Sequence, residues 1–241
     1  MLDPDKKIGY IRISSFIQST GEEVRKALET LKEQGAKGIV LDLRDNPGGL
    51  LQEAVGICRL FVESGTLVTT RRDDQTVKKE HLADGSTAGL DVPIAVLVNR
   101  GTASASEIVA ACLQDHRLAT IVGQRTYGKG TVQEVIELPW GQGALRLTTS
   151  SYWRPSGVNI NRRKDASEKE EWGVSPDPGC AVKLTGAQIE KLIRWRQQRR
   201  LDQANGANRA EPQTELDVDP QLARAVQSVL ARLKPAPPRS P

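Results

Sequence analysis

The sequence predicts an α+β protein built on strand and helix units, and three observations lead to that prediction. Residues 7–14, 20–35 and 38–43 have in turn the patterns of a strand, a helix and a second strand. The apolar run 94–98 is followed at once by a small-residue helix start at 102–107. Pairs of strand-like runs separated by short turns predict hairpins. The chain therefore combines βαβ-like units with antiparallel pairs.

The first four elements alternate between strand and helix. Residues 7–14 are rich in β-branched and aromatic side chains, which is typical of a strand covered on both faces. The helix that begins at Thr20 carries two glutamates in its first turn and ends at a glycine. The apolar strand 38–43 then leads through the loop 46–49 into a helix over 51–62. Two glycines in that loop allow the close backbone approach that an anion or oxyanion site needs, and a simple turn between strand and helix is the equal alternative.

The middle of the chain predicts two hairpins around the central unit. Residues 65–82 have the pattern of an exposed hairpin, and 83–92 are polar enough to form a loop. After the helix that begins near residue 102, the apolar run 118–122 predicts another strand. The runs 132–138 and 144–150 are separated by a turn-forming segment and predict the second hairpin.

The C-terminal part predicts a helical extension beyond a core that spans residues 1–184. Residues 185–202 have the pattern of a basic amphipathic helix, and 203–216 are polar and linker-like. A last helix over 217–234 has an apolar face that must dock on the core or on a partner. The proline-rich end, 235–241, is expected to be disordered.

Composition excludes several classes of protein. Of the 241 residues 38% are hydrophobic and 27% charged, which is ordinary for a globular protein, but only 4% are aromatic, so the core is aliphatic. The net charge is +4, and the excess is concentrated at 191–200 beside a single aromatic, Trp195, which argues against nucleic-acid binding. The cysteines Cys58, Cys112 and Cys180 lack metal-ligand spacing, so we expect no metal, and the first two are interpreted as small core residues.

The hydropathy of the sequence predicts neither a membrane span nor a signal peptide in this chain. No stretch approaches the roughly 20 apolar residues of a membrane span. The first residues have no apolar core, so we expect no signal peptide in this chain.

Ser104 is the candidate nucleophile. It lies where the apolar run 94–98 turns sharply into a helix, beside backbone N–H groups without partners and the positive end of the helix dipole. That environment suits a group that attacks a carbonyl and leaves an oxyanion. Ser106 is the rival nucleophile, and a helix rotates it by about 200° from Ser104. Glu107 is interpreted as a charge that stabilises the helix N-terminus.

Lys129 is the candidate base that activates the serine. The two histidines are not placed for this role, since His81 lies in a charged segment and His116 in a turn at the far end of the helix. Lys129 stands between glycines after one strand and before another, where crowding by backbone and partial desolvation favour loss of its proton. Serine and lysine pairs are a known variant of the catalytic triad.

Three blocks together resemble one family. GTASASE at 101–107 and YGKGTVQ at 127–133 resemble the C-terminal processing (tail-specific) serine peptidases, in which serine and lysine form a dyad. The spacing between Ser104 and Lys129 is also the one that this family uses. A third block, LDLRDNPGG at 41–49, resembles the family's DLRxNPGG loop. The resemblance covers roughly residues 7–185.

This resemblance implies a fold and a set of roles. The fold would be of the ClpP/crotonase-like kind, with a peptidase core of ββα units and no cofactor. Gln133 would orient the lysine, and the Ala105 N–H with that of Gly48 or Gly49 would form the oxyanion hole. Asp115 would support activity, although a solvent-facing residue at the helix end is an equal alternative.

The resemblance also implies a setting for the protein. The substrates would be proteins or peptides with exposed C-terminal tails. The sequence does not determine the oligomeric state, and a homo-oligomer is one alternative. The family is mostly periplasmic or otherwise extracytoplasmic, and its members usually carry a PDZ domain before the first strand seen here. We therefore expect this chain to be either a fragment of such a protein or a reduced form without the PDZ domain that binds the substrate.

Two alternatives come from other classes. Residues 123–129 fit most of a phosphate-binding loop, but Gly130 replaces the required Ser or Thr and a strand pattern follows where a helix is needed. A non-catalytic binding module with a peptidase-like fold is the second alternative, and the presence of Ser104, Lys129 and Gln133 argues against it.

Overall fold

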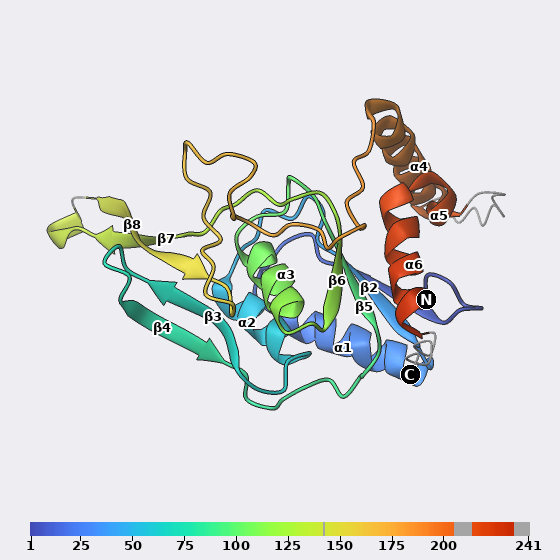
Figure 1. Ribbon diagram of the computed structural model, residues 1–241, viewed down its shortest axis with the longest axis horizontal. Coiled ribbons are helices and arrows are strands. Elements are labelled where there is room, and N and C mark those ends of the chain that lie inside the picture. The colour runs from blue at the N-terminus through green and yellow to red at the C-terminus, as the bar shows by residue number, and fades with distance from the viewer. Residues whose placement is uncertain (142, 205–213, 234–241) are drawn as a thin grey trace, which may run out of the picture.

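The computed structural model describes residues 1–141, 143–204 and 214–233, and within them it has a mixed α/β architecture (Figure 1). A parallel sheet forms the centre, with the strand order β1 (Ile8–Arg12), β2 (Gly38–Asp42), β5 (Ile94–Val98) and β6 (Ala119–Gly123). A separate antiparallel sheet has the order β4 (Val77–Leu82), β3 (Thr66–Arg71), β8 (Ala144–Trp153) and β7 (Thr131–Glu137). The turn between β7 and β8 contains the short 3₁₀ segment η1 (Pro139–Gly141).

Helices cover both faces of the parallel sheet. On one face lie α1 (Thr20–Glu33), α2 (Leu51–Arg59) and α3 (Ala105–Asp115), and on the other lies α6 (Pro220–Leu233). Because successive side chains of a strand point to opposite faces, Leu41 packs with the first group of helices while its neighbour Val40 packs against α6. All five residues of β2 and of β5 are buried for this reason.

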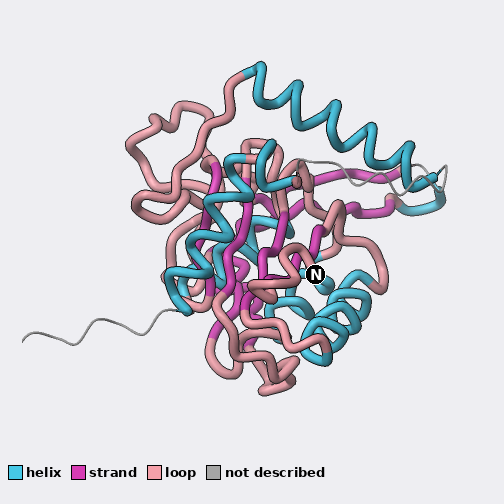
Figure 2. The backbone as a smooth tube through the Cα atoms, turned by 90° about the vertical axis from the view of Figure 1, so that its right-hand side faces the viewer, coloured by secondary structure: helices cyan, strands magenta, loops and turns pink. Residues whose placement is uncertain are grey.

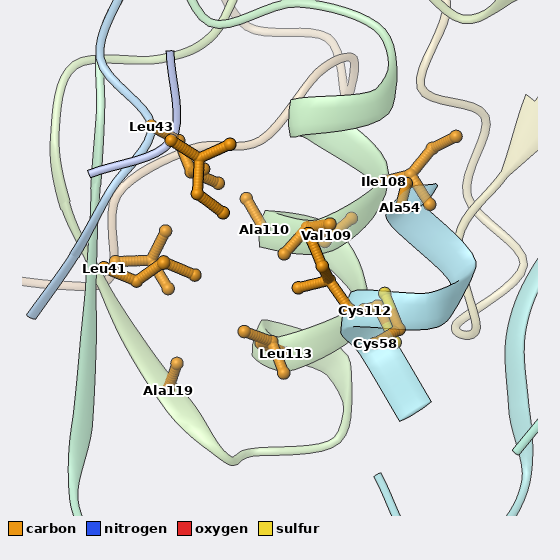
Figure 3. Packing of buried hydrophobic residues seen from close by; sticks show 14 of the residues in the cluster. Leu41, Leu43, Ala54, Cys58, Ile108, Val109, Ala110, Cys112, Leu113 and Ala119 are labelled. Carbon is orange, nitrogen blue, oxygen red and sulfur yellow. The ribbon is translucent and has the colours of Figure 1, made fainter. Parts of the chain in front are cut away.

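The core beneath α3 fixes the position of that helix. Figure 3 shows Leu41 and Leu43, from β2 and the residue after it, on one side of α3 and Cys58 of α2 on the other. Val109 and Leu113 of α3 are fully buried in this cluster. Burial of each such side chain stabilises the fold by about 1.5–3 kcal/mol. These contacts hold α3 in place, and with it the turn at the N-terminus of the helix.

The C-terminal helices differ in how they are attached. α6 contacts β2, β5 and β6, and its buried residues close a second core with the sheet. α4 (Gly186–Ala204) contacts α5 (Glu215–Val218) and projects from the body of the molecule (Figures 1 and 2). Thus the predicted last helix docks on this chain's own core.

Most predicted elements are confirmed. The strands, the helices and both hairpins lie where the sequence indicated, to within a few residues. One expectation was half wrong, because only β4 of the 65–82 hairpin is exposed. β3 is largely buried, since β8 pairs with its other edge and α2 and α3 pack against it.

The predicted domain division is a separate matter and stays a prediction. α5 begins inside the expected linker 203–216, whose residues 205–213 lie outside the described part of the chain, as does the expected tail 235–241. Cys58, Cys112 and Cys180 are free and buried, as the interpretation of the first two as core residues required. In the described ranges no helix is both long and apolar enough to cross a bilayer.

Candidate active site

Ser104 occupies a sharp turn between β5 and α3. Its backbone has φ 58° and ψ −118°, a conformation that costs a non-glycine residue about 1–3 kcal/mol and persists only when its surroundings impose it. The buried Thr102 helps to impose it, since its hydroxyl donates to the Leu43 carbonyl at 2.8 Å and accepts from the Asn99 N–H at 3.0 Å. The Ser104 side chain is partly exposed at the top of this turn.

The loop after β2 lies directly against this turn. A Cβ atom on Gly48 would lie 2.7 Å from the Ala103 oxygen, 2.8 Å from the Ser104 Cβ and 2.9 Å from the Ala105 nitrogen. Gly48 also has φ +98°, so both the lack of space for a Cβ and the backbone conformation require a glycine here. Because glycine is present, two backbone segments that are distant in sequence meet at the candidate nucleophile.

Two backbone N–H groups are available there. Among the hydrogen bonds of the described residues, the N–H groups of Gly49 and Ala105 donate to no acceptor. The Gly48 N–H, in contrast, donates to the Asn46 Oδ1 at 2.9 Å. The geometry therefore favours Gly49 over Gly48 as the partner of Ala105 in an oxyanion hole.

The Glu107 carboxylate joins the serine turn to the lysine loop. Its side chain is fully buried and accepts four hydrogen bonds. Oε2 accepts from the Ser104 N–H and from the Lys129 N–H, each at 2.8 Å, so a single oxygen atom bridges these two nitrogens. Oε1 accepts from the Gly128 N–H at 2.7 Å and from the Thr126 hydroxyl at 2.5 Å.

This role of Glu107 goes beyond a helix N-terminal charge. Burial raises the pKa of Glu107 above its usual range, and the four donors oppose that rise without cancelling it. The spacing Ser104-x-x-Glu107 is the sequence signal for a capping box, which the structure contains. That signal predicts the bond to Ser104, but not the bonds to residues 126–129.

Lys129 lies at the site, but its side chain is more exposed to solvent than the sequence predicted. Its flanking glycines allow close packing, since a Cβ on Gly128 would lie 2.6 Å from the Arg162 Cβ and one on Gly130 would lie 2.2 Å from the Asn161 nitrogen. The lysine side chain itself is exposed and not partly desolvated, because the loop packs on residues 161 and 162 through its backbone.

Gln133 lies four residues further on, in β7. The pairing of β7 with β8 shifts register between Val132 and Gln133, and such bulges re-aim side chains. Gln133 is exposed, and within the described part of the chain no hydrogen bond joins the side chains of Ser104, Lys129 and Gln133. The structure thus brings the backbones of Ser104, Gly48 and Lys129 together, whereas the side-chain dyad stays a prediction.

Asp115 lies at the opposite end of α3 from Ser104, about 16 Å away at 1.5 Å per residue. It does not face solvent, because its carboxylate accepts from Arg154 Nε at 3.0 and 3.1 Å and from the Ser156 N–H at 2.9 Å. Burial would raise the pKa of Asp115, but these donors outweigh it and lower the pKa. Asp115 therefore anchors the turn at 154–156, and any part in activity is indirect.

The structure removes two rival interpretations. Ser106 is fully buried and its hydroxyl donates to the Asn46 carbonyl at 3.1 Å, so it is a structural residue. The phosphate-loop alternative is wrong, because strand β7 follows Lys129 where a phosphate loop requires a helix N-terminus. In the described ranges no three His, Cys, Asp or Glu residues lie together in a group that could hold a metal ion.

The comparisons identify the family. The sequence profile of peptidase family S41 matches residues 7–178, which is well over half of the chain. The chain therefore belongs to peptidase family S41. The resemblance to C-terminal processing peptidases is confirmed by its relatives.

Three similar proteins show how much of each is shared. The carboxyl-terminal-processing protease of Synechocystis sp. is 46% identical over 159 residues, which cover 66% of this chain and 36% of that protein. The chloroplastic C-terminal processing peptidase of Tetradesmus obliquus is 40% identical over 189 residues, covering 78% of this chain and 38% of that protein. The solved structure of the photosystem II D1 C-terminal processing protease matches with a TM-score of 0.66 and 39% identity, over 73% of this chain and 42% of that one. The chain thus spans little more than a third of the length of these curated relatives.

Proposed function

We propose that this chain carries the catalytic core of a serine endopeptidase that hydrolyses peptide bonds near protein C-termini with a Ser104–Lys129 dyad. The observation that carries the proposal is the shared acceptor Glu107, which ties the Ser104 N–H and the Lys129 N–H to one carboxylate oxygen. A single buried anion therefore sets the spacing of the two residues. A non-catalytic module would not need a strained, partly exposed serine at this point.

The proposed chemistry follows from the positions of these groups. Neutral Lys129 Nζ takes the proton from Ser104 Oγ as that oxygen attacks the substrate carbonyl carbon. The oxyanion accepts hydrogen bonds from the Gly49 and Ala105 N–H groups, each worth on the order of 3–4 kcal/mol in the transition state. Lys129 then gives the proton to the leaving amine, and a water molecule hydrolyses the acyl-enzyme through the same base. Substrate that covers the exposed lysine favours its neutral form by desolvation.

The orienting role of Gln133 belongs to the same proposal. The bulge at Val132 and Gln133 gives the Gln133 amide a direction different from that of regular strand alternation. An amide oxygen that accepts from Lys129 Nζ would hold the amine toward Ser104.

The remaining features rest on the relatives. Several of them are named as C-terminal processing proteases, and some of these are named as chloroplastic, which supports protein substrates with exposed C-terminal tails and an extracytoplasmic location. We also propose a core of the ClpP/crotonase-like kind with ββα units, because α1, α2 and α3 each follow a strand of the parallel sheet and the strands β3, β4 and β5 follow one another before α3. Association into a homo-oligomer would be tested by light scattering.

The test is cleavage of an unfolded protein with an apolar C-terminal tail, followed by mass spectrometry of the products. We expect cleavage near the C-terminus by the unmodified chain, and none by Ser104→Ala or Lys129→Ala. Ser106→Ala is the matched control: it keeps the proposed nucleophile and therefore still cleaves, at a rate lowered by the loss of the bond to the Asn46 carbonyl. Cleavage by the folded Ser104→Ala variant would refute the proposal.

A further inference from the structure

A buried ion cluster joins the carboxyl end of β2 to the C-terminal helices. The Arg44 side chain is 3% exposed and forms two bonds with Asp42, from Nε to Oδ1 at 2.9 Å and from Nη2 to Oδ2 at 2.6 Å. Its remaining nitrogen, Nη1, donates to Asp219 Oδ1 at 3.0 Å and to Gln221 Oε1 at 3.1 Å. The carboxylates of Asp42 and Asp219 are fully buried.

A second arginine closes the cluster from α4. Arg196 Nη2 lies 2.9 Å from Glu215, 3.4 Å from Asp219 and 3.8 Å from Asp42. We call Asp42, Arg44, Arg196, Glu215 and Asp219 the C-terminal ion cluster. Its three carboxylates and two guanidinium groups come from β2 and the residues after it, from α4, and from the segment that contains α5 and the start of α6. Charges buried this deeply are stable only as a complete set, because a missing partner leaves an uncompensated charge.

Arg44 is directly connected to the oxyanion loop. The next residue, Asp45, has φ +59°, a strained value for a residue other than glycine, and the Asn99 side chain bonds to its N–H and its carboxylate. The residue after it, Asn46, donates from Nδ2 to the Ile13 carbonyl and accepts the Gly48 N–H.

The main chain of Asn46 reaches the nucleophile turn as well. Its carbonyl accepts from the Ala103 N–H at 3.0 Å, one residue before Ser104, and from the Ser106 hydroxyl. The turn from Arg44 to Gly49 is therefore held at one end by the C-terminal ion cluster and at the other by the nucleophile turn.

We propose that Asp219, with Gln221, is a positioning residue of the peptidase reaction, which acts through Arg44 on the turn that presents the Gly49 N–H. This inference rests on the proposed function. Both residues lie beyond the family match, which ends at residue 178, and 175 residues separate Asp219 from Arg44. The docked C-terminal helix would thus be part of what makes the oxyanion site competent.

Loss of the Asp219 charge should change kcat more than KM, because the Gly49 N–H bonds to the oxyanion that forms during the reaction. Without the Asp219 charge, Arg44 has one carboxylate in place of two, and the strained turn beside it loses part of its support. The Gly49 N–H contacts the oxyanion chiefly in the transition state, so its misplacement lowers kcat and leaves KM nearly unchanged. A displacement of about 1 Å in such a site can reduce the rate by about 100-fold.

Asp219→Asn is the variant that isolates this role. Asp219 Oδ1 also caps α6 by accepting the N–H groups of Gln221 and Leu222, each at 3.1 Å, and asparagine caps a helix as well as aspartate does. The substitution therefore removes the charge while keeping shape and cap. The matched control is Val229→Ala, a fully buried residue of the same helix that packs on the sheet outside the C-terminal ion cluster.

The experiment compares both variants with the unmodified chain in peptide cleavage and in amide hydrogen exchange. We expect Asp219→Asn to lower kcat by about 10- to 100-fold at constant KM and to speed exchange in the peptide 44–49. Val229→Ala should lower the melting temperature while kcat per folded molecule and exchange at 44–49 stay unchanged. Equal effects of the two variants on both readouts would overturn the inference. If the unmodified chain does not cleave, the proposed function fails, and exchange at 44–49 still decides whether Asp219 controls the turn.

Discussion

Replacement of Glu107 by glutamine tests the shared acceptor most directly. The glutamine carbonyl can keep the two bonds that Oε2 now accepts, from the Ser104 and Lys129 N–H groups. Its NH₂ group then faces the Oε1 donors, where the Thr126 hydroxyl can turn to accept but the Gly128 N–H cannot. One buried donor left unsatisfied costs about 1–3 kcal/mol in the free energy of unfolding.

Replacement by alanine should be far more severe. Three backbone N–H groups then lose their acceptor, which gives about 3–9 kcal/mol by the same estimate, with entering water reducing the upper figure. The expected order of stability is therefore unmodified chain, Glu107→Gln, Glu107→Ala. In the alanine variant Ser104 and Lys129 lose their common acceptor, so kcat should fall by about 100-fold or more. The glutamine variant keeps that acceptor, but the lost Gly128 bond loosens the lysine loop, so kcat should still fall by about 10-fold.

The pH dependence of Glu107 has a defined sign. Since its folded-state pKa is raised, the folded protein binds this proton more tightly than the unfolded chain does. The stability gained from that proton is complete below about pH 4.5 and is lost as pH rises through the raised pKa. Activity should move the opposite way, falling as pH drops through that pKa, because a protonated carboxyl accepts fewer bonds. Glu107→Gln should remove this titration from both profiles.

Urea denaturation and initial cleavage rates are the assays for these variants. The matched control is Glu53→Gln, since Glu53 occupies the same position in α2 and accepts a backbone N–H from Gly21, at 2.7 Å, in place of one from the serine turn or the lysine loop. The reasoning is refuted if Glu107→Gln unfolds within about 0.5 kcal/mol of the unmodified chain, the range of an ordinary surface substitution, and retains its kcat within twofold.

Two further predictions concern the loop after β2 and acid stability. Gly48→Ala should abolish cleavage and destabilise the fold by several kcal/mol, because its Cβ would lie within 3 Å of three atoms of the nucleophile turn. Urea denaturation and peptide cleavage measure the two effects. An active Gly48→Ala protein would contradict the close approach of this loop to the nucleophile turn. Asp42 and Asp115 have lowered pKa values, since Arg44 and Arg154 outweigh the burial that would raise them, so the stability they contribute is complete above about pH 4 and is lost as pH falls through their folded-state pKa values. Melting temperatures recorded from pH 6 to pH 2 should show this loss, and Asp115→Asn should make it smaller.

Local signals were sufficient for most of the elements. The turn at 99–104 is short and carries its own glycine and capping residues, so strand, turn and helix could be assigned without any distant contact. The hairpins were found for the same reason, since their pattern has a period of two and their turns are local. The burial of β3 was missed, because it depends on pairing with β8, a strand that lies far along the chain.

The candidate site was predictable in its residue types but not in its connections. The serine, the lysine and the glycine loop were recognised from blocks and spacing, whereas Glu107 was interpreted only as a helix charge. Its bonds to Gly128 and Lys129 span 21 and 22 residues and depend on how the lysine loop folds back. The sequence also left Gly48 and Gly49 equal, and only the bond between Gly48 and Asn46 separates them.

The sequence by itself thus determined the order of strands and helices and the candidate nucleophile, because periodicity, capping and turn residues act over a few positions. It indicated the family through the resemblance of the three blocks at 41–49, 101–107 and 127–133. Only the tertiary structure decided that the Glu107 carboxylate lies between Ser104 and Lys129, and that Asp219 reaches Arg44 across 175 residues. Both are buried charges, whose partners are selected by packing and by the cost of leaving a charge unpaired, and no local pattern records that choice.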